Sequence, residues 1–178
     1  GTKPVAGKQR FDVPRLETYM RAHVEGFAGS LEVEQFKGGQ SNPTYRLSAG
    51  GKRYVMRSKP GPAAKLLPSA HAVDREFRVI SALGKTDIPV PRTYALCEDD
   101  GVIGTMFYIM DCIEGRVLWD QALPGMTKAQ RFAIWDELNR VMAQLHTIDY
   151  RAGGLGTLGK HGNYHARQSG RWTHQYQA

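Results

Sequence analysis

Hydrophobic residues recur at helical spacing near the start of the chain and then alternate, which predicts a helix followed by antiparallel strands. Between residues 12 and 29, one face of a helix ending near Gly29 would carry Leu16, Tyr19, Met20, His23, Val24 and Phe27. Three strands are predicted next, over Leu31–Lys37, Thr44–Ala49 and Lys52–Arg57. Gly50 and Gly51 between the last two strands are typical of a hairpin turn.

The pattern then returns once to helical spacing before two more strands complete the sheet. Val73, Phe77, Ile80 and Leu83 share a helix face, and Gly84 follows as a stop signal. Strands are expected over Thr93–Cys97 and Thr105–Met110, on either side of a turn at residues 99–101. The first half therefore predicts an α+β fold with a five-stranded antiparallel sheet and one inserted helix.

After Gly115 the pattern is helical only. Thr127 and Gln130 have capping-box spacing, and they precede an apolar stripe that runs to His146. A glycine-rich loop, GGLGTLG, separates this helix from a second one, which is indicated by Tyr164, Gln168, Trp172 and Tyr176.

Composition narrows the class of protein. With 178 residues and 41% hydrophobic content, the chain is long enough to bury a core. It has no run of about 18 apolar residues and no signal-peptide pattern, so we expect a cytoplasmic protein without membrane contact. Gly1 stands where an initiator Met would, and the first residues are left out of the fold prediction. Cys97 and Cys112 are expected to be buried thiols, because their spacing is not that of metal ligands.

The net charge of +7 favours an anionic partner, and no acidic residue follows Arg151 in a segment that carries several basic ones. A nucleic-acid binder would interleave aromatic and basic residues on one exposed face. Here the aromatic residues mostly occupy core spacing, so no nucleic-acid partner is expected. The sequence does not indicate an oligomeric state.

The segment GGQSN, residues 38–42, is either a hairpin turn or a loop whose backbone N–H groups approach a phosphate. The second function requires a cation on the third strand. Alternation in RYVMR places Arg53, Val55 and Arg57 on one sheet face, where Val55 could lie under an adenine and Arg57 could reach phosphate. The alternative for Arg57 is an ordinary exposed strand arginine.

Two further features of a nucleotide site follow in order along the chain. Glu76, at the edge of the helical apolar stripe, could hold Arg57 in place; otherwise it is a solvated helix residue. The strand ending at Met110 leads directly into DCIEG, residues 111–115, where a hinge between two lobes would lie. Its alternative is an ordinary strand-to-helix loop.

In this order, the motifs resemble the aminoglycoside phosphotransferase family, which shares a two-lobed fold with protein kinases. The resemblance rests on GGQSNPTYRL, RYVMRSKPG, VDREFRVISAL, IPVPRTYAL, FYIMDCIEGR and LHTID. The segments IPVPR, LWDQALPGM and NYHARQSGRWTHQY are similar to a subgroup associated with acyl-CoA dehydrogenases. Residues 1–110 would then form the N-terminal lobe, residues 111–115 the hinge, and residues 116–178 the start of a helical C-terminal lobe.

The resemblance also implies a nucleotide site and its ligands. ATP with Mg²⁺ would be the cofactor, and the acceptor would be a hydroxyl group of a small molecule. The association with acyl-CoA dehydrogenases suggests a hydroxyacyl-CoA as that molecule. Arg57, where the wider family has lysine, would pair with Glu76, while the Asp111 carbonyl and the Ile113 N–H would hold adenine. The nucleotide-binding loop would comprise Gly38, Gly39, Gln40, Ser41, Asn42 and Thr44.

One departure from the family is that residues 1–178 contain neither its H-G-D-x-x-x-x-N catalytic loop nor its metal-binding Asp motif. We expect these in a continuation of the chain, so no catalytic residue or metal ligand is assigned here. His161 and His165 are spaced as two metal ligands would be on a helix, but Gly162 between them disfavours a helix there. The alternative function is a pseudokinase module that binds nucleotide or coenzyme A without catalysis.

Overall fold

The computed structural model describes residues 1–5, 7–38, 42–61, 72–159 and 162–177. They form two compact units, Gly1–Ile148 and Asp149–Ala178, which are described separately. The first unit combines an antiparallel sheet with helices, so the predicted α+β class is confirmed.

The sheet has six strands in the order β1-β2-β3-β4-β6-β5, and the neighbouring strands are antiparallel. Five of them match the prediction, with ends that shift by up to two residues. They are β2 (Glu32–Phe36), β3 (Thr44–Ala49), β4 (Lys52–Ser58), β5 (Thr93–Cys97) and β6 (Phe107–Asp111). Strand β6 extends to Asp111, which the sequence had assigned to the hinge.

The sixth strand, β1 (Thr2–Pro4), corrects the predicted count of five. It lies at the sheet edge, where Thr2 pairs with Phe36 and Pro4 with Glu34. A three-residue strand containing proline has no readable alternation, and proline is tolerated at an edge because it needs to donate no ladder hydrogen bond. A 3₁₀ turn, η1 (Gly7–Gln9), follows it.

Helix α1 (Val13–His23) covers one face of the sheet with its apolar side. It begins after Asp12, whose side chain accepts a hydrogen bond from Arg15 N at 3.1 Å. Leu16 and Met20 are fully buried in a core shared with Leu47, Met56 and other sheet residues. The helix ends earlier than the predicted Gly29, because the chain turns extended at Val24, which is nevertheless buried.

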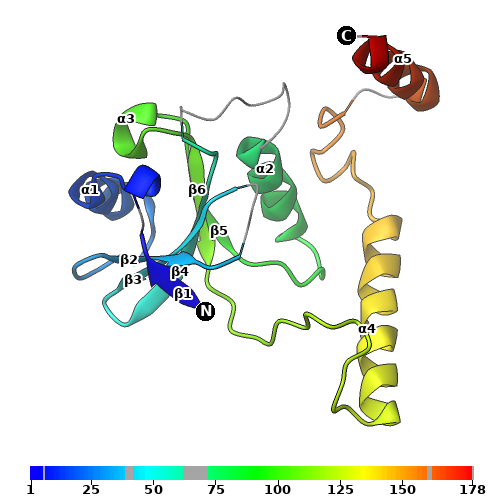
Figure 1. The fold of residues 1–178 in the computed structure, drawn as a ribbon, viewed down its shortest axis with the longest axis horizontal. Coiled ribbons are helices and arrows are strands. Elements are labelled where there is room, and N and C mark those ends of the chain that lie inside the picture. The colour runs from blue at the N-terminus through cyan, green and yellow to red at the C-terminus, as the bar shows by residue number, and fades with distance from the viewer. Residues whose placement is uncertain (6, 39–41, 62–71, 160–161, 178) are drawn as a thin grey trace. The chain divides into compact units, whose positions relative to one another are not determined.

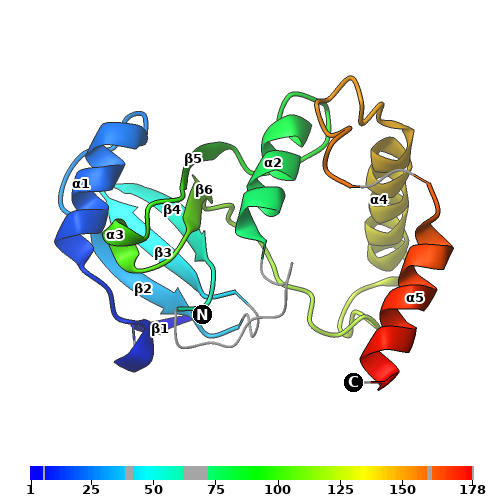
Figure 2. The same cartoon turned by 90° about the horizontal axis from the view of Figure 1, so that it is seen from above.

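Helix α2 (Val73–Leu83) packs on β5 and β6, and Figures 1 and 2 show it on the side of the sheet opposite to α1. One face of the sheet therefore packs against α1 to form the core, and α2 borders the other face. The predicted turn at residues 99–101 is instead the start of a single helical turn, α3 (Asp100–Ile103). Asp99 caps α3 by accepting from Gly101 N at 2.7 Å.

Two longer helices follow, as predicted. Helix α4 (Lys128–Thr147) begins at a complete capping box, in which Thr127 and Gln130 each bind the other's backbone N–H. Helix α5 (Tyr164–Gln177) belongs to the second unit. No helix in the described ranges is both long and apolar enough to cross a membrane.

Candidate nucleotide-binding site

The register of three neighbouring strands places the candidate residues in rows across the sheet. Arg57 on β4 lies between Thr44 on β3 and Tyr108 on β6. One row further along, Val55 lies between Arg46 and Met110. Directly opposed residues in antiparallel strands have Cβ atoms about 5 Å apart, so each row forms a continuous strip of side chains.

Alternation along β4 divides its side chains between the two faces as the sequence predicted. Tyr54 and Met56 belong to the core under α1, and both are almost completely buried. Val55 and Arg57 therefore point to the face bordered by α2. Val55 is only 8% exposed, so it can serve as an apolar floor beside the cationic Arg57.

Arg57 and Glu76 form an ion pair between β4 and α2. Arg57 Nε lies 2.7 Å from Glu76 Oε2, and each side chain is about one-third exposed, 32% and 35%. Within the described part of the chain, no acceptor is aligned with the Nε–H as a hydrogen bond requires. The contact therefore neutralises charge without by itself fixing the orientation of the guanidinium group.

The Glu76 carboxylate has two further partners. Asn42 Nδ2 donates to Oε1 at 3.2 Å, and the Tyr108 hydroxyl donates to Oε2 at 3.2 Å. Asn42 is 3% exposed and Tyr108 is 1% exposed. Burial first, and the Glu76 charge second, raise the pKa of Tyr108. Tyr108 therefore remains a protonated donor at neutral pH.

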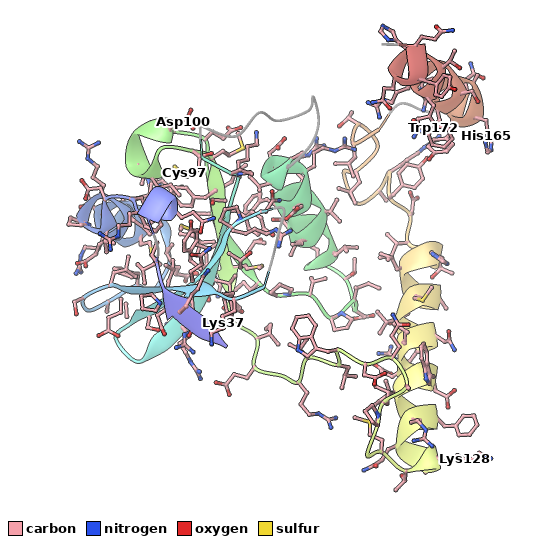
Figure 3. All side chains as sticks on the ribbon, viewed as in Figure 1. Lys37, Cys97, Asp100, Lys128, His165 and Trp172 are labelled. Atoms are coloured by element: carbon pink, nitrogen blue, oxygen red, sulfur yellow. The ribbon has the colours of Figure 1, made fainter. Side chains whose placement is uncertain are left out.

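Of the predicted phosphate loop, the structure describes Gly38, Asn42 and Thr44. Lys37 leads into it directly after β2 (Figure 3), and Thr44 Oγ1 donates to the Asn42 carbonyl at 3.2 Å. Gly39, Gln40 and Ser41 lie outside the described residues. Asn42 thus connects this segment to α2 through its side chain and to β3 through its backbone.

The predicted hinge begins at the end of β6. Asp111 Oδ1 accepts from the Tyr94 hydroxyl at 2.5 Å, and Asp111 N donates to the Arg92 carbonyl at 2.8 Å. The hydrogen bond to Asp111, together with burial, raises the pKa of Tyr94 to about 12. Asp111 is thereby held against β5, whereas Ile113 is 68% exposed.

Arg53, on the same β4 face as Arg57, has a different partner. It forms an ion pair with Glu114, just after the end of β6. The two side chains are 49% and 69% exposed, so this contact lies in solvent. The structure thus gives the two arginines different partners: Arg57 is joined to α2 and Arg53 to the segment after β6.

Among the residues that the structure describes, no group of three or more His, Cys, Asp or Glu side chains could hold a metal ion. His161, half of the histidine pair considered above, lies outside the described residues. Cys97 is buried and Cys112 half-buried, and both are free thiols.

Sequence reasoning missed one residue of the site, Tyr108, and one contact, that of Asn42 with Glu76. Tyr108 was assigned only to an apolar strand, although alternation with the core residues Phe107 and Ile109 places Tyr108 and Met110 on the Val55 face. That alternation was the available signal. Asn42 was predicted as a phosphate-loop residue, but its side-chain contact with Glu76 depends on the tertiary fold and could not be read from spacing.

The chain belongs to the phosphotransferase enzyme family, whose model matches residues 32–178. It is similar in structure to a protein of Ralstonia eutropha provisionally named an aminoglycoside phosphotransferase, with a TM-score of 0.80 and 60% sequence identity over 94% of this chain. The fold is therefore the kinase-like one that the sequence predicted.

Curated relatives connect the chain with acyl-CoA dehydrogenases. It is 40% identical to mouse acyl-CoA dehydrogenase family member 10 over 99% of its length. Its identity to chicken acyl-CoA dehydrogenase family member 11 is 44% over 100% of its length. The chain spans only 16% and 23% of these two relatives, and 48% of the Ralstonia protein.

Proposed function

We propose that residues 1–178 supply the nucleotide-binding side of an ATP-dependent phosphotransferase that transfers the γ-phosphate to a small-molecule hydroxyl. The observation that carries this proposal is the Arg57–Glu76 pair on the sheet face that also carries Val55. It places a cation, paired with α2, beside an apolar floor, which suits a triphosphate attached to a flat base. The family membership supports the same reaction class.

In this proposal the described residues bind and orient the nucleotide. Gly38, Asn42 and Thr44, with residues 39–41 between them, approach the phosphates from the loop, and Arg57 neutralises the α- and β-phosphates. Mg²⁺ bound with ATP would neutralise the remaining charge, and its ligands are proposed to lie outside residues 1–178. The kinase-like family is what implies both ATP and a divalent metal.

The proposed lobes meet at residues 111–115. The Asp111 carbonyl and the Ile113 N–H are proposed to hold adenine, with Asp111 fixed by its contacts to Tyr94 and Arg92. Residues 1–110 would then act as the N-terminal lobe and residues 116–178 as the beginning of the C-terminal lobe.

For the acceptor we propose an anionic hydroxyl compound, specifically a hydroxyacyl-CoA. The relatives named as acyl-CoA dehydrogenases support this class. Helix α5, which carries His165 and Trp172 (Figure 3), has no acidic residue, and Arg167 and Arg171 are exposed on it. A cationic amino sugar would be repelled by such a surface, whereas the phosphates of coenzyme A would be attracted.

The test is phosphate transfer from [γ-³²P]ATP with Mg²⁺ by the full-length protein, against a panel of hydroxyacyl-CoAs, amino sugars and choline-like alcohols. We expect labelling of a hydroxyacyl-CoA by the full-length protein and none by residues 1–178 alone. Binding of Mg-ATP without labelling of any acceptor would favour the pseudokinase alternative. Acceptor-dependent turnover by residues 1–178 would show that a catalytic carboxylate lies within them.

A further inference from the structure

The Glu76 carboxylate is held by side chains from three other segments. Its Oε1 accepts from Asn42, which follows the glycine-rich segment. Its Oε2 accepts from Tyr108 on β6 and lies 2.7 Å from Arg57 Nε on β4. These four residues form one polar cluster, defined here as the Glu76 cluster, that joins the loop, two strands and α2.

The two hydrogen-bond donors are far more buried than the ion pair that they contact. Asn42 and Tyr108 are 3% and 1% exposed, whereas Arg57 and Glu76 are about one-third exposed. A buried donor without a partner is costly, so the contact with the carboxylate is favourable for both side chains. Asn42 and Tyr108 are therefore the buried part of the cluster, and Arg57 is the part that solvent can reach.

The geometry also shows why the cation depends on this support. A glutamate side chain has three rotatable bonds, and the Arg57 Nε–H is not aligned with a hydrogen-bond acceptor within the described residues. The Arg57–Glu76 contact alone would leave both groups free to turn. Donors on each carboxylate oxygen restrict the plane of the carboxylate, and with it the place of the negative charge that attracts the guanidinium group.

We propose that Asn42 and Tyr108 are positioning residues for nucleotide phosphate binding, which act through Glu76 on Arg57. This inference rests on the proposed function of the site. Asn42 has the additional effect of joining the segment just before β3 to α2. Tyr108 acts without touching the nucleotide, and the Asn42 side chain acts through Glu76 in addition to any phosphate contact made by its backbone.

The phenyl ring of Tyr108 has a separate structural role, which the test must leave intact. It packs against Phe77 of α2, with ring centroids 6.0 Å apart. Tyr108→Phe keeps this ring and removes only the donor. Tyr45→Phe is the matched control, because Tyr45 is also a buried strand tyrosine, 3% exposed, but belongs to the core on the α1 face.

The experiment compares the affinities of the full-length protein for Mg-ATP and for adenosine, measured by calorimetry. Tyr108→Phe and Asn42→Ala are each expected to weaken ATP binding about three- to tenfold, the effect of one hydrogen bond to a charged group acting indirectly. Adenosine binding should stay unchanged, because adenosine has no phosphate for Arg57 to contact. Tyr45→Phe should leave both affinities unchanged, and thermal melting verifies that each variant is folded.

Two further variants separate positioning from general loosening of the fold. In an Arg57→Ala background, Tyr108→Phe should weaken ATP binding no further, because the group through which it acts is gone. Asn42→Asp keeps the side-chain volume but faces Glu76 with a second carboxylate, so its loss of ATP affinity should exceed that of Asn42→Ala.

The possible failures are distinguishable. If the unaltered protein binds neither ATP nor adenosine, the proposed function is wrong and the positioning role falls with it. If the unaltered protein binds ATP and the Tyr108 and Asn42 variants bind it equally well, only the positioning role is wrong. Equal losses for ATP and adenosine, or an undiminished Tyr108→Phe effect in the Arg57→Ala background, would likewise overturn it.

Discussion

At the scale of single residues, β4 shows how partners distinguish side chains of the same type. Arg53 and Arg57 are four residues apart on one sheet face, yet Arg53 pairs in solvent with Glu114 and Arg57 pairs with Glu76 beside buried donors. Solvent-exposed ion pairs contribute little, because water and salt screen them. The local environment, and not the charge itself, makes Arg57 the candidate phosphate ligand.

This difference predicts unequal effects of removing the two arginines. Arg57→Ala should weaken Mg-ATP binding by the full-length protein about tenfold or more, the loss of a charge-assisted contact to phosphate. Arg53→Ala removes the same charge from the same strand face and should change the affinity less than about twofold. Isothermal titration of both variants makes the comparison. Equal losses would reduce Arg57 to a surface residue.

At the scale of elements, α1 illustrates how a short helix is stabilised by the face that it buries. Leu16 and Met20, one turn apart, are both 0% exposed and contact the sheet core. Most of the stability of such a helix comes from this packing and little from intrinsic propensity.

We therefore predict that Leu16→Ala lowers the free energy of unfolding by about 2–5 kcal/mol, because it leaves a cavity in the core. Thr18→Ala, on the exposed side of the same helix, should change it by less than about 0.5 kcal/mol. Urea unfolding followed by circular dichroism gives both values. A small loss for Leu16→Ala would mean that α1 is not needed to complete the core.

The start of α4 gives a second prediction for an element. Thr127→Ala removes a side chain that accepts from Gln130 N at 3.2 Å, and should cost the helix about 0.5–2 kcal/mol. Thr127→Ser keeps the hydroxyl, so it should lower the stability of the helix by a clearly smaller amount than Thr127→Ala does. Amide hydrogen exchange at the first turn measures the loss locally. Equal exchange in the two variants would contradict a capping role.

Elements with a strong period were predictable, and those built by tertiary contacts were not. The apolar spacing identified α2 and the alternation in β4 placed Tyr54 and Met56 in the core. Strand β1 was missed because the first residues were left out of the fold prediction, and its three residues are a strand only through pairing with β2. Helix α3 was read as a turn, because one helical turn and a β-turn share the same Asp and Gly signals.

The candidate site divides in the same way. The side-chain period alone predicted that Val55 and Arg57 share a sheet face and that Glu76 lies at the edge of the apolar stripe of its helix. The hydrogen bonds from Asn42 and Tyr108 to Glu76 join residues that are 34 and 32 positions apart in the sequence. They connect α2 with the segment before β3 and with β6. No local rule specifies such contacts, since they depend on how α2 is set against the sheet.

At the scale of the whole molecule, buried tyrosines make the stability of the fold depend on pH. Burial raises the pKa values of Tyr45, Tyr54 and Tyr108, and all three are at most 3% exposed. A raised pKa means that the folded state holds the phenolic proton more firmly than the unfolded chain does. Their contribution to stability is present in full below the ordinary tyrosine pKa of about 10, and it is lost as the pH rises through the folded-state values.

Tyr54 offers the sharpest test of this effect, because its buried hydroxyl has no hydrogen-bond partner in the described part of the chain. Tyr54→Phe should cost little or nothing at pH 8 and should flatten the fall in unfolding free energy as the pH rises above about 10. The slope that one such tyrosine adds approaches about 1.4 kcal/mol per pH unit where the phenol is ionised in the unfolded chain and protonated in the folded protein. Tyr176→Phe, which removes a phenol that is 94% exposed, should leave the slope unchanged. Urea titrations at successive pH values measure it, and an unaltered slope in Tyr54→Phe would show that this phenol is already ionised or hydrated in the folded protein.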